Sequence, residues 1–240
     1  MQNKTLDSLS PQKILNLQLC NLGIKIKENK TICSNIKKLT DELKNKELKY
    51  FNPRYYIGDE WFSPSDSISI SIPFFLCHPK LRKLEKQKVG FVEGSNSKWF
   101  MRLLRHEAGH CIDYAYQFSK SKEWRKIFGN PNKKYSVDAY PFDITSKDFV
   151  INLEDHYAQS HPEEDFAETF AVWLQYDKPT WKNKYRTWTK ALNKLKYIDK
   201  KCNEIKDLPP LYTTTSQLAN INRLRITLKT YYNIKSKHKM

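Results

Sequence analysis

The sequence has no pair of cysteines with the close spacing of a small zinc module. Its cysteines are odd in number and widely separated, at Cys20, Cys33, Cys77, Cys111 and Cys202, and no C-x-x-C pair occurs. This absence argues against a disulfide framework and against a cysteine-rich zinc module. It favours a reducing compartment, so we expect a cytoplasmic protein.

Long apolar segments are also missing. No run of about 18 apolar residues occurs, so the sequence predicts no transmembrane helix. Residues 1–11 are polar and lack the apolar centre of a secretory signal, which agrees with the expected cytoplasmic location. Hydrophobic residues make up 39% of the 240 residues, so the chain is rich and long enough to build one sizeable core.

Acidic residues are scarce relative to basic ones. The chain has 42 Lys and Arg against 26 Asp and Glu, which gives a net charge of +16. Such a balance favours attraction to nucleic acid, anionic membranes or acidic proteins. The lysines are spread from end to end, however, and the clusters at 194–196, 200–201 and 235–239 read most simply as solvated faces or a tail. Recognised nucleic-acid-binding motifs are absent, so nucleic acid is not an expected partner.

The sequence does contain the catalytic motif H-E-x-x-H, at His106, Glu107 and His110. On a helix the two histidines lie one turn apart on the same face, so both imidazoles can reach one metal ion. Glu107 projects beside them, where it can take a proton from a metal-bound water. The alternative is a pair of core histidines flanking a salt-bridged glutamate.

The residues around the motif favour a helix over 97–116. This segment has no proline, and its apolar residues cover most of the circumference and leave a narrow polar stripe. Ser95, Asn96 and Ser97 offer oxygen atoms that can cap the first turn. The two histidines and the glutamate of the motif therefore fall on the mostly buried side of a long helix.

A second helix is predicted over 162–176. Pro162 suits its first turn, and the acidic residues that follow suit the positive end of the helix dipole. Glu168 lies a turn further in, among apolar residues, where a carboxylate needs a partner. Glu164 shares its face, and the economical solution is that this face meets the histidines across a metal ion. Two histidines, one carboxylate and a water make a catalytic zinc site, and the other carboxylate would orient a histidine. The spacing leaves open which carboxylate binds the metal.

The H-E-A-G-H motif and the segment 157–174 together resemble a bacterial family of zinc-binding metallopeptidases, a gluzincin-like group. The likeness covers roughly residues 15–231. A more distant likeness is to anthrax lethal factor and the Pro-Pro endopeptidases. Those proteases share a tyrosine, a ligand glutamate seven residues later and a second glutamate four residues further on, a spacing matched by Tyr157, Glu164 and Glu168.

The resemblance implies a role for each of these three residues. Glu164 would be the third zinc ligand, Glu168 would support a ligand histidine from behind, and Tyr157 would donate a hydrogen bond to the tetrahedral oxyanion. The alternative for Tyr157 is a structural aromatic residue before a helix. His156 and His161 compete as ligands, although a histidine before a proline is more often exposed or an N-cap.

The remaining patterns predict a small sheet. Residues 50–58 are aromatic and β-branched, and residues 67–73 alternate isoleucine with serine before Pro73, as in an edge strand with one buried face. Such an edge could pair with an extended peptide, or it could be an ordinary half-buried strand.

We expect an α+β, zincin-like (gluzincin) single domain with a small, mostly antiparallel sheet, an active-site helix and a second helix that carries the glutamate ligand. Its predicted parts are the domain at 1–234, with an N-terminal helical cover at 1–49 and a C-terminal helical part at 178–234, and a basic tail at 235–240.

The function that these patterns favour is that of a zinc-dependent metallopeptidase. One Zn²⁺ per chain would be bound by His106, His110 and Glu164, and Glu107 would act as general base on a peptide or protein substrate.

Two alternatives remain: a non-catalytic, zinc-containing binding protein, and a basic nucleic-acid-binding protein on a zincin fold. A closed sphere of four protein ligands would favour the first, and salt-sensitive nucleic-acid binding the second. The sequence does not define a substrate or an oligomeric state.

Overall fold

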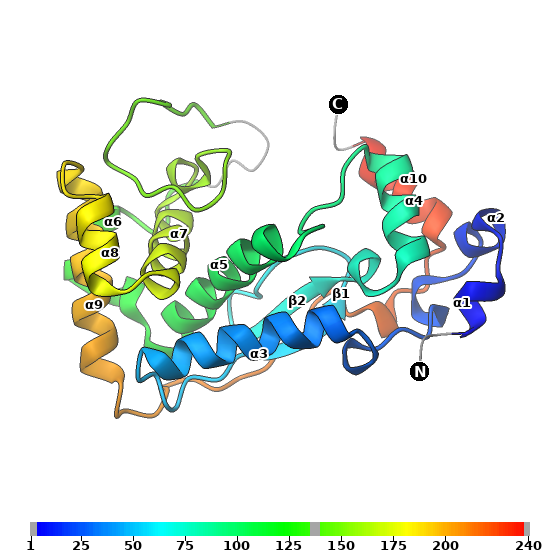
Figure 1. The fold of residues 1–240 in the computed structure, drawn as a ribbon, viewed down its shortest axis with the longest axis horizontal. Helices are drawn as coiled ribbons and strands as arrows, with labels where there is room; N and C mark the ends of the chain where they lie inside the picture. Colours follow the sequence, from blue (N-terminus) through cyan, green and yellow to red (C-terminus); the bar gives the residue numbers. More distant parts are fainter. Residues whose placement is uncertain (1–3, 135–139, 238–240) are drawn as a thin grey trace.

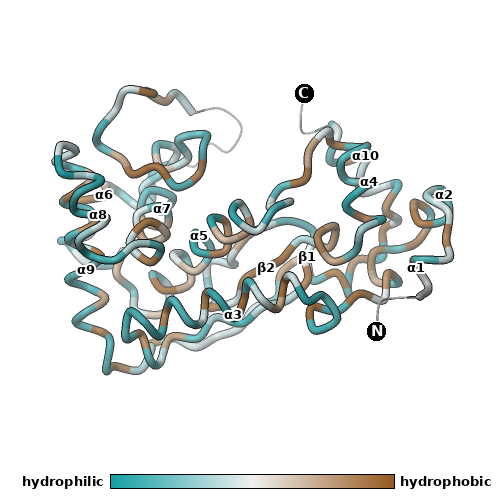
Figure 2. Tube along the Cα trace, viewed as in Figure 1, coloured by the Kyte–Doolittle hydropathy of each residue, from teal (hydrophilic) through white to brown (hydrophobic). Residues whose placement is uncertain are grey.

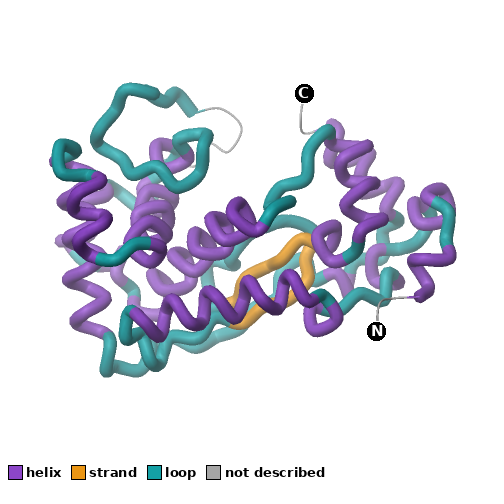
Figure 3. Tube along the Cα trace, in the orientation of Figure 1, coloured by secondary structure: helices purple, strands orange, loops and turns teal. Residues whose placement is uncertain are grey.

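The structure is a computed structural model that describes residues 4–134 and 140–237. Helices dominate it, and two short strands lie among them (Figures 1 and 3). The α-helices are α1 (Lys4–Ser8), α2 (Pro11–Leu15), α3 (Lys30–Asn45), α4 (Pro79–Val89), α5 (Ser97–Tyr116), α6 (Lys122–Phe128), α7 (Pro162–Gln175), α8 (Lys178–Lys184), α9 (Thr189–Ile205) and α10 (Leu228–Lys237). The strands are β1 (Arg54–Gly58) and β2 (Ser69–Pro73), and the 3-10 helices are η1 (Leu19–Asn21), η2 (Ile26–Glu28), η3 (Phe74–Cys77), η4 (Phe118–Lys120), η5 (Tyr157–Gln159) and η6 (Ile221–Arg223).

One continuous hydrophobic core runs through the described residues, with buried side chains from Leu6 to Tyr232. Helix α3 shows how the sequence builds it. Its buried residues Ile32, Leu39 and Leu43 recur at helical spacing, and Figure 2 shows the helix alternating between hydrophobic and hydrophilic positions along its length. All five cysteines carry free thiols. Across the described residues, no helix combines the length and apolarity needed to cross a membrane.

Helix α5 has the bounds that the sequence predicted. The side chain of Asn96 caps it by accepting a 2.9 Å hydrogen bond from the backbone N–H of Trp99. The helix ends where Gln117 takes a left-handed conformation, with φ of 56°. Most of its circumference is buried, including His106 at its middle, and His110 is partly buried. The helix therefore carries the H-E-x-x-H motif through the centre of the molecule (Figure 1).

Helix α7 crosses α5 at very short distance. Pro162 occupies its first turn, and the ring of His161 caps it by accepting a 3.2 Å hydrogen bond from Glu163 N–H. At the crossing, Gly109 of α5 meets Ala167 of α7. A Cβ at position 109 would lie 2.7 Å from the Ala167 Cα, closer than real Cβ contacts. The glycine thus allows the two helices that carry the predicted ligands to approach each other.

The two strands run parallel, which corrects the expected mostly antiparallel sheet. Their register pairs Arg54 with Ser69 and Gly58 with Pro73. Between the strands the chain turns back, and Phe62 forms an antiparallel bridge with residue 71 on the other edge of β2. The alternation of isoleucine and serine predicted a strand correctly, but it contains no information about strand direction.

The serines of β2 are buried, whereas the alternation suggested a solvent-facing row. The Ser71 hydroxyl donates a 2.7 Å hydrogen bond to the carbonyl of Glu60. The hydroxyl of Ser67, just before the strand, accepts a 2.8 Å bond from the backbone of Ser216. Because these hydroxyls bond to segments that cover the sheet, they can be buried at little cost. Strand β2 is therefore not the exposed edge that the sequence predicted.

Lys194 is a buried ion-pair partner, in contrast to the solvated face predicted for residues 194–196. It lies on α9, and its Nζ is 2.6 Å from a carboxylate oxygen of Asp165 on α7. Its ammonium group also donates to the carbonyl of Asp148 and lies over the ring of Phe149. Periodicity alone does not separate such a lysine from its exposed neighbours.

The predicted basic tail at 235–240 begins inside a helix. Helix α10 continues to Lys237, and the Nζ of Lys235 lies 2.8 Å from Glu85 on α4 and 2.5 Å from Glu60. These contacts make residue 235 part of the packed structure. The last three residues of the predicted tail lie outside the described residues.

Candidate metal centre

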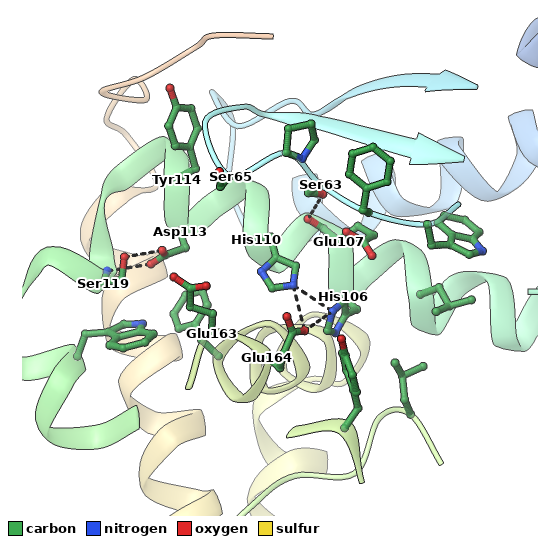
Figure 4. A pocket seen from close by; sticks show the side chains of 18 of the residues that line it. Ser63, Ser65, His106, Glu107, His110, Asp113, Tyr114, Ser119, Glu163 and Glu164 are labelled. Atoms are coloured by element: carbon green, nitrogen blue, oxygen red, sulfur yellow. Dashed lines mark hydrogen bonds and ion pairs between the residues drawn. The ribbon is translucent and has the colours of Figure 1, made fainter. Parts of the chain in front are cut away.

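His106 and His110 point into one space from adjacent turns of α5. Their Nε2 atoms are 3.1 Å apart, and Figure 4 shows both rings facing the same carboxylate. That carboxylate belongs to Glu164 on α7, whose Oε2 is 3.0 Å from the Nε2 of His106 and 3.2 Å from that of His110. The three donor atoms thus form a nearly regular triangle, and this group could hold a metal ion.

The size of this triangle suits a tetrahedral zinc ion. Two donors at the usual zinc distance and a tetrahedral angle are about 3.3 Å apart. The observed separations of 3.0–3.2 Å would reach that value with small shifts. Two imidazoles and one carboxylate are also the donor set of catalytic zinc sites with an open fourth position. The residues present therefore fit the ion that the sequence motif predicts.

Glu168 lies behind His106. Its Oε1 is 2.8 Å from the Nδ1 of that histidine, the nitrogen opposite the triangle. The same carboxylate accepts hydrogen bonds of 2.7 Å from the Asn152 side chain and 2.8 Å from the Leu153 N–H, and it is fully buried. The two glutamates that the spacing could not distinguish thus face different nitrogens of one imidazole: Glu164 faces Nε2, and Glu168 faces Nδ1.

The electrostatics of the group favour positive charge. Burial alone would lower the pKa of His106, but the hydrogen bonds and charges of Glu164 and Glu168 outweigh burial and raise it well above its ordinary value. Burial likewise opposes the ionised form of Glu164, and the two histidines nevertheless hold its pKa well below the ordinary value. A site that stabilises cationic histidines in this way can equally stabilise a bound cation.

Glu107 contributes a carboxylate that is buried and incompletely paired. The residue is 6% exposed, and its Oε2 has no hydrogen-bond partner among the described residues. Burial raises the pKa of its carboxyl group, although both histidines act against the shift. Its backbone carbonyl accepts a 3.1 Å hydrogen bond from the Ser63 hydroxyl, which fixes the segment after β1 against α5 (Figure 4).

Tyr157 lies beside the histidines, whereas the two competing histidines do not join them. The ring centres of Tyr157 and His106 are 5.7 Å apart, and Tyr157 lines the same cavity. His156 is stacked on Phe142 with ring centres 5.4 Å apart. His161 caps α7, and its other nitrogen lies 2.9 Å from a backbone carbonyl. In the part of the chain that the structure describes, neither belongs to the donor group.

The donor group opens into a cavity of about 780 Å³. One wall is the segment 61–65, which the sequence analysis did not assign to the site. Glu93, Asp113 and Asp155 also line it, and sequence reasoning missed all three. They come from separate segments and share no periodic pattern, so no local signal identifies them. A volume of this size holds several residues of an extended peptide.

Two helices that cross at a glycine bring a His-His-Glu group that could hold a metal ion to the floor of an open cavity. The comparisons with known proteins define the family. Residues 91–229, more than half of the chain, match the family model described as "Putative zinc-binding metallo-peptidase". The chain belongs to this family. The matched region begins later than the expected 15–231, so both strands lie outside it. No curated protein and no solved structure matches the chain.

Proposed function

We propose that this protein is a zinc-dependent metallopeptidase that binds one Zn²⁺ per chain through His106, His110 and Glu164. The observation that carries the proposal is the triangle of donors within one cavity, with the unpartnered Oε2 of Glu107 beside it. The family supports peptidase activity at a coarse level. The donor set and the two supporting helices agree with a zincin-like, gluzincin-type arrangement in one domain over residues 1–234.

Each residue of the site has a separate task in this proposal. A zinc ion, when bound, would acidify a water and polarise the substrate carbonyl. The Oε2 of Glu107 takes the proton of the attacking water and returns it to the leaving amine, as its burial and raised pKa favour. The phenolic hydroxyl of Tyr157 donates a hydrogen bond to the oxyanion of the tetrahedral intermediate. Glu168 holds the Nδ1–H of His106 and so fixes the tautomer that presents Nε2 to the metal.

The number of protein donors supports catalysis over a purely structural zinc. A structural site is closed by four protein ligands, whereas a catalytic site keeps one position open. The described residues bring together three donors, and these line the cavity. The proposal therefore favours a peptide or protein substrate that reaches the metal from the cavity.

Peptide hydrolysis by the zinc-loaded protein tests this function. We expect cleavage of unstructured protein or mixed peptides, loss of cleavage with a chelator, and recovery when zinc is added. Glu107→Gln should lower kcat by about 10²–10⁴-fold while zinc remains bound. Glu204→Gln, on the surface of α9, is the matched control and should retain full activity. If Glu107→Gln cleaves as fast as the control, the assigned base is wrong.

A further inference from the structure

The cavity around the donor group is acidic, although the chain as a whole is strongly basic. Among the described residues, one lysine, Lys120, lines it. The carboxylates that line it are Glu93, Glu107, Asp113, Asp155, Glu163 and Glu164. A divalent cation held by the donor group would offset Glu107 and Glu164. Four carboxylates would then still face one lysine, in a protein with a net charge of +16.

These four carboxylates lack a lysine or arginine partner within the described chain. Neither lysine nor arginine lies within ion-pair distance of Glu93, Asp113, Asp155 or Glu163 there, although the sequence has 42 such residues. Glu163 has His161 at 3.8 Å. On α7, by contrast, the buried carboxylate of Asp165 is paired with Lys194. Carboxylates in a cavity that no lysine or arginine neutralises can meet a cation from outside the chain.

One pair of these carboxylates lies beyond the C-terminal side of the histidines. Asp113 is one turn past His110 on α5, and both of its oxygens accept hydrogen bonds from Ser119, at 2.9 Å to the backbone and 2.7 Å to the hydroxyl. Figure 4 shows Asp113 and Glu163 on the same side of the donor group, away from Glu107. Burial raises the pKa of Asp113 to about 6, because a buried carboxylate without a cation is penalised. Ser119 thus holds a carboxylate ready for a cationic partner.

The second pair lies toward the N-terminal half of α5. Glu93 precedes Gly94, where an added Cβ would lie 3.4 Å from the Leu103 side chain. Glu93 and Asp155 also line an adjoining hollow of about 280 Å³ beside Trp99. The cations of that hollow are Lys98 and Arg102, and Arg102 is already bound to Glu154 at 2.8 Å. Burial raises the pKa of Glu93 to about 7.

The cavity is long enough for both pairs to contact one peptide. Its floor is the face of α5 formed by Leu103, His106, His110 and Asp113, and it continues to Gln117, where the helix ends. Residues 103 and 117 are fourteen positions apart, which corresponds to about 21 Å at the rise of a helix. About six residues of an extended peptide cover the same distance. A substrate whose scissile bond lies at the histidines would therefore place side chains near each acidic pair.

We infer that the cavity binds an extended peptide with lysine or arginine side chains on both sides of the cleaved bond, recognised by Asp113 with Glu163 and by Glu93 with Asp155. This inference rests on the proposed function and adds the substrate class. It does not rest on the acidic residues alone. The buried, unpartnered Oε2 of Glu107 and the donor group lie in the same cavity, and both independently indicate a ligand there.

Digestion of a degenerate peptide mixture by the zinc-loaded protein, with cleavage sites read by mass spectrometry, tests the inference. We expect lysine and arginine to be enriched on both sides of the cleaved bonds. A cleaved peptide and its lysine-to-glutamine counterpart then serve as a matched pair. The double variant Asp113→Asn/Glu163→Gln should lower kcat/KM for the basic peptide by about tenfold and leave the neutral peptide nearly unchanged. Glu204→Gln is again the control.

The outcomes separate this inference from the proposed function. Cleavage without any preference for basic residues overturns the inference and leaves the peptidase intact. Absence of all cleavage contradicts the proposed function. A measurement of peptide binding then tests by itself whether the cavity prefers basic peptides. In that case, fluorescence anisotropy should show that a lysine-rich peptide binds the zinc-loaded protein more tightly than a glutamate-rich one. The double variant should lose this difference, and equal binding of both peptides would overturn the inference.

Discussion

Glu164 and Glu168 are the same residue type one turn apart on α7, yet they meet opposite nitrogens of His106. Their separation into a candidate ligand and a supporting carboxylate depends on depth. Glu164 reaches the cavity, whereas Glu168 is fully buried and satisfied by Asn152 and the Leu153 N–H. Sequence spacing placed both on one face but could not rank them. The distant family likeness implied the assignment that the geometry supports.

Glu168→Gln should weaken zinc binding without removing a ligand. The N–H of the new amide would face either the Leu153 N–H or the Nδ1–H of His106, and both of these are donors. The negative charge that supports His106 would also be lost. We expect zinc affinity to fall by about 10–100-fold. Competition with a chromophoric chelator measures it. Glu163→Gln, on the same helix but exposed, should bind zinc as the wild type does. Equal affinities for the two variants would contradict the supporting role of Glu168.

Glu93 should make the stability of the metal-free protein depend on pH. Burial, reinforced by the charge of Glu60, raises the pKa of Glu93 to about 7, so the folded chain holds this proton more tightly than the unfolded chain. Its contribution to stability is therefore present at low pH and lost as the pH rises through about 7. Glu93→Gln, which stays neutral, should raise the Tm relative to wild type at pH 8 and much less at pH 5. A Tm difference that does not change with pH would contradict this.

At the scale of elements, the crossing of α5 and α7 positions the site. Gly109→Ala gains about 1 kcal/mol of helix propensity. The added Cβ would lie 2.7 Å from the Ala167 Cα, and such overpacking costs about 1–3 kcal/mol. We expect net destabilisation in urea denaturation and weaker zinc binding, because α7 must move away from the histidines. Ala167→Gly should not rescue the variant, since the nearest atom is backbone. A variant as stable as wild type with normal zinc affinity would contradict this account.

Helix α9 is fixed to α7 by the buried pair of Lys194 and Asp165. Lys194→Met removes the cation and leaves a buried carboxylate unpaired, which costs about 3–5 kcal/mol. Urea denaturation at neutral pH should show this loss of stability. The double variant Lys194→Met/Asp165→Asn should recover part of it, because no buried charge remains. If the single and double variants are equally stable, the pair does not act as described.

The elements that the sequence predicted well are those with strong local signals. Helix α5 follows from its apolar periodicity and the Asn96 cap, and α7 follows from Pro162 and the acids of its first turn. The direction of β2 and the burial of its serines could not be predicted. Both depend on segments far away in the sequence, including the bonds of Ser67 to Ser216. A strand pattern shows which residues alternate, and the neighbours decide whether each face meets water.

At the scale of the whole molecule, charge is distributed in a way that composition conceals. The net charge of +16 suggested anionic partners, yet carboxylates outnumber lysines among the charged residues that line the cavity around the donor group. Two lysines predicted to be solvated form ion pairs: Lys194 is buried, and Lys235 is partly buried. The H-E-x-x-H motif was identified from local spacing, whereas Glu93 and Asp155 come together only through the tertiary fold. Local patterns thus predicted the two histidines and two candidate carboxylates, the family likeness implied the choice of Glu164, and the cavity around them required the structure.

The zinc content of the purified protein, measured by elemental mass spectrometry, tests the central claim most directly. The wild type should carry about one zinc per chain, as a mononuclear site requires. His110→Ala and Glu164→Ala should lose most of it, and Glu163→Ala, which replaces the neighbouring exposed carboxylate, should retain it. A wild type without zinc after reconstitution, or a Glu164→Ala variant that keeps its full zinc content, would contradict the proposed metal centre.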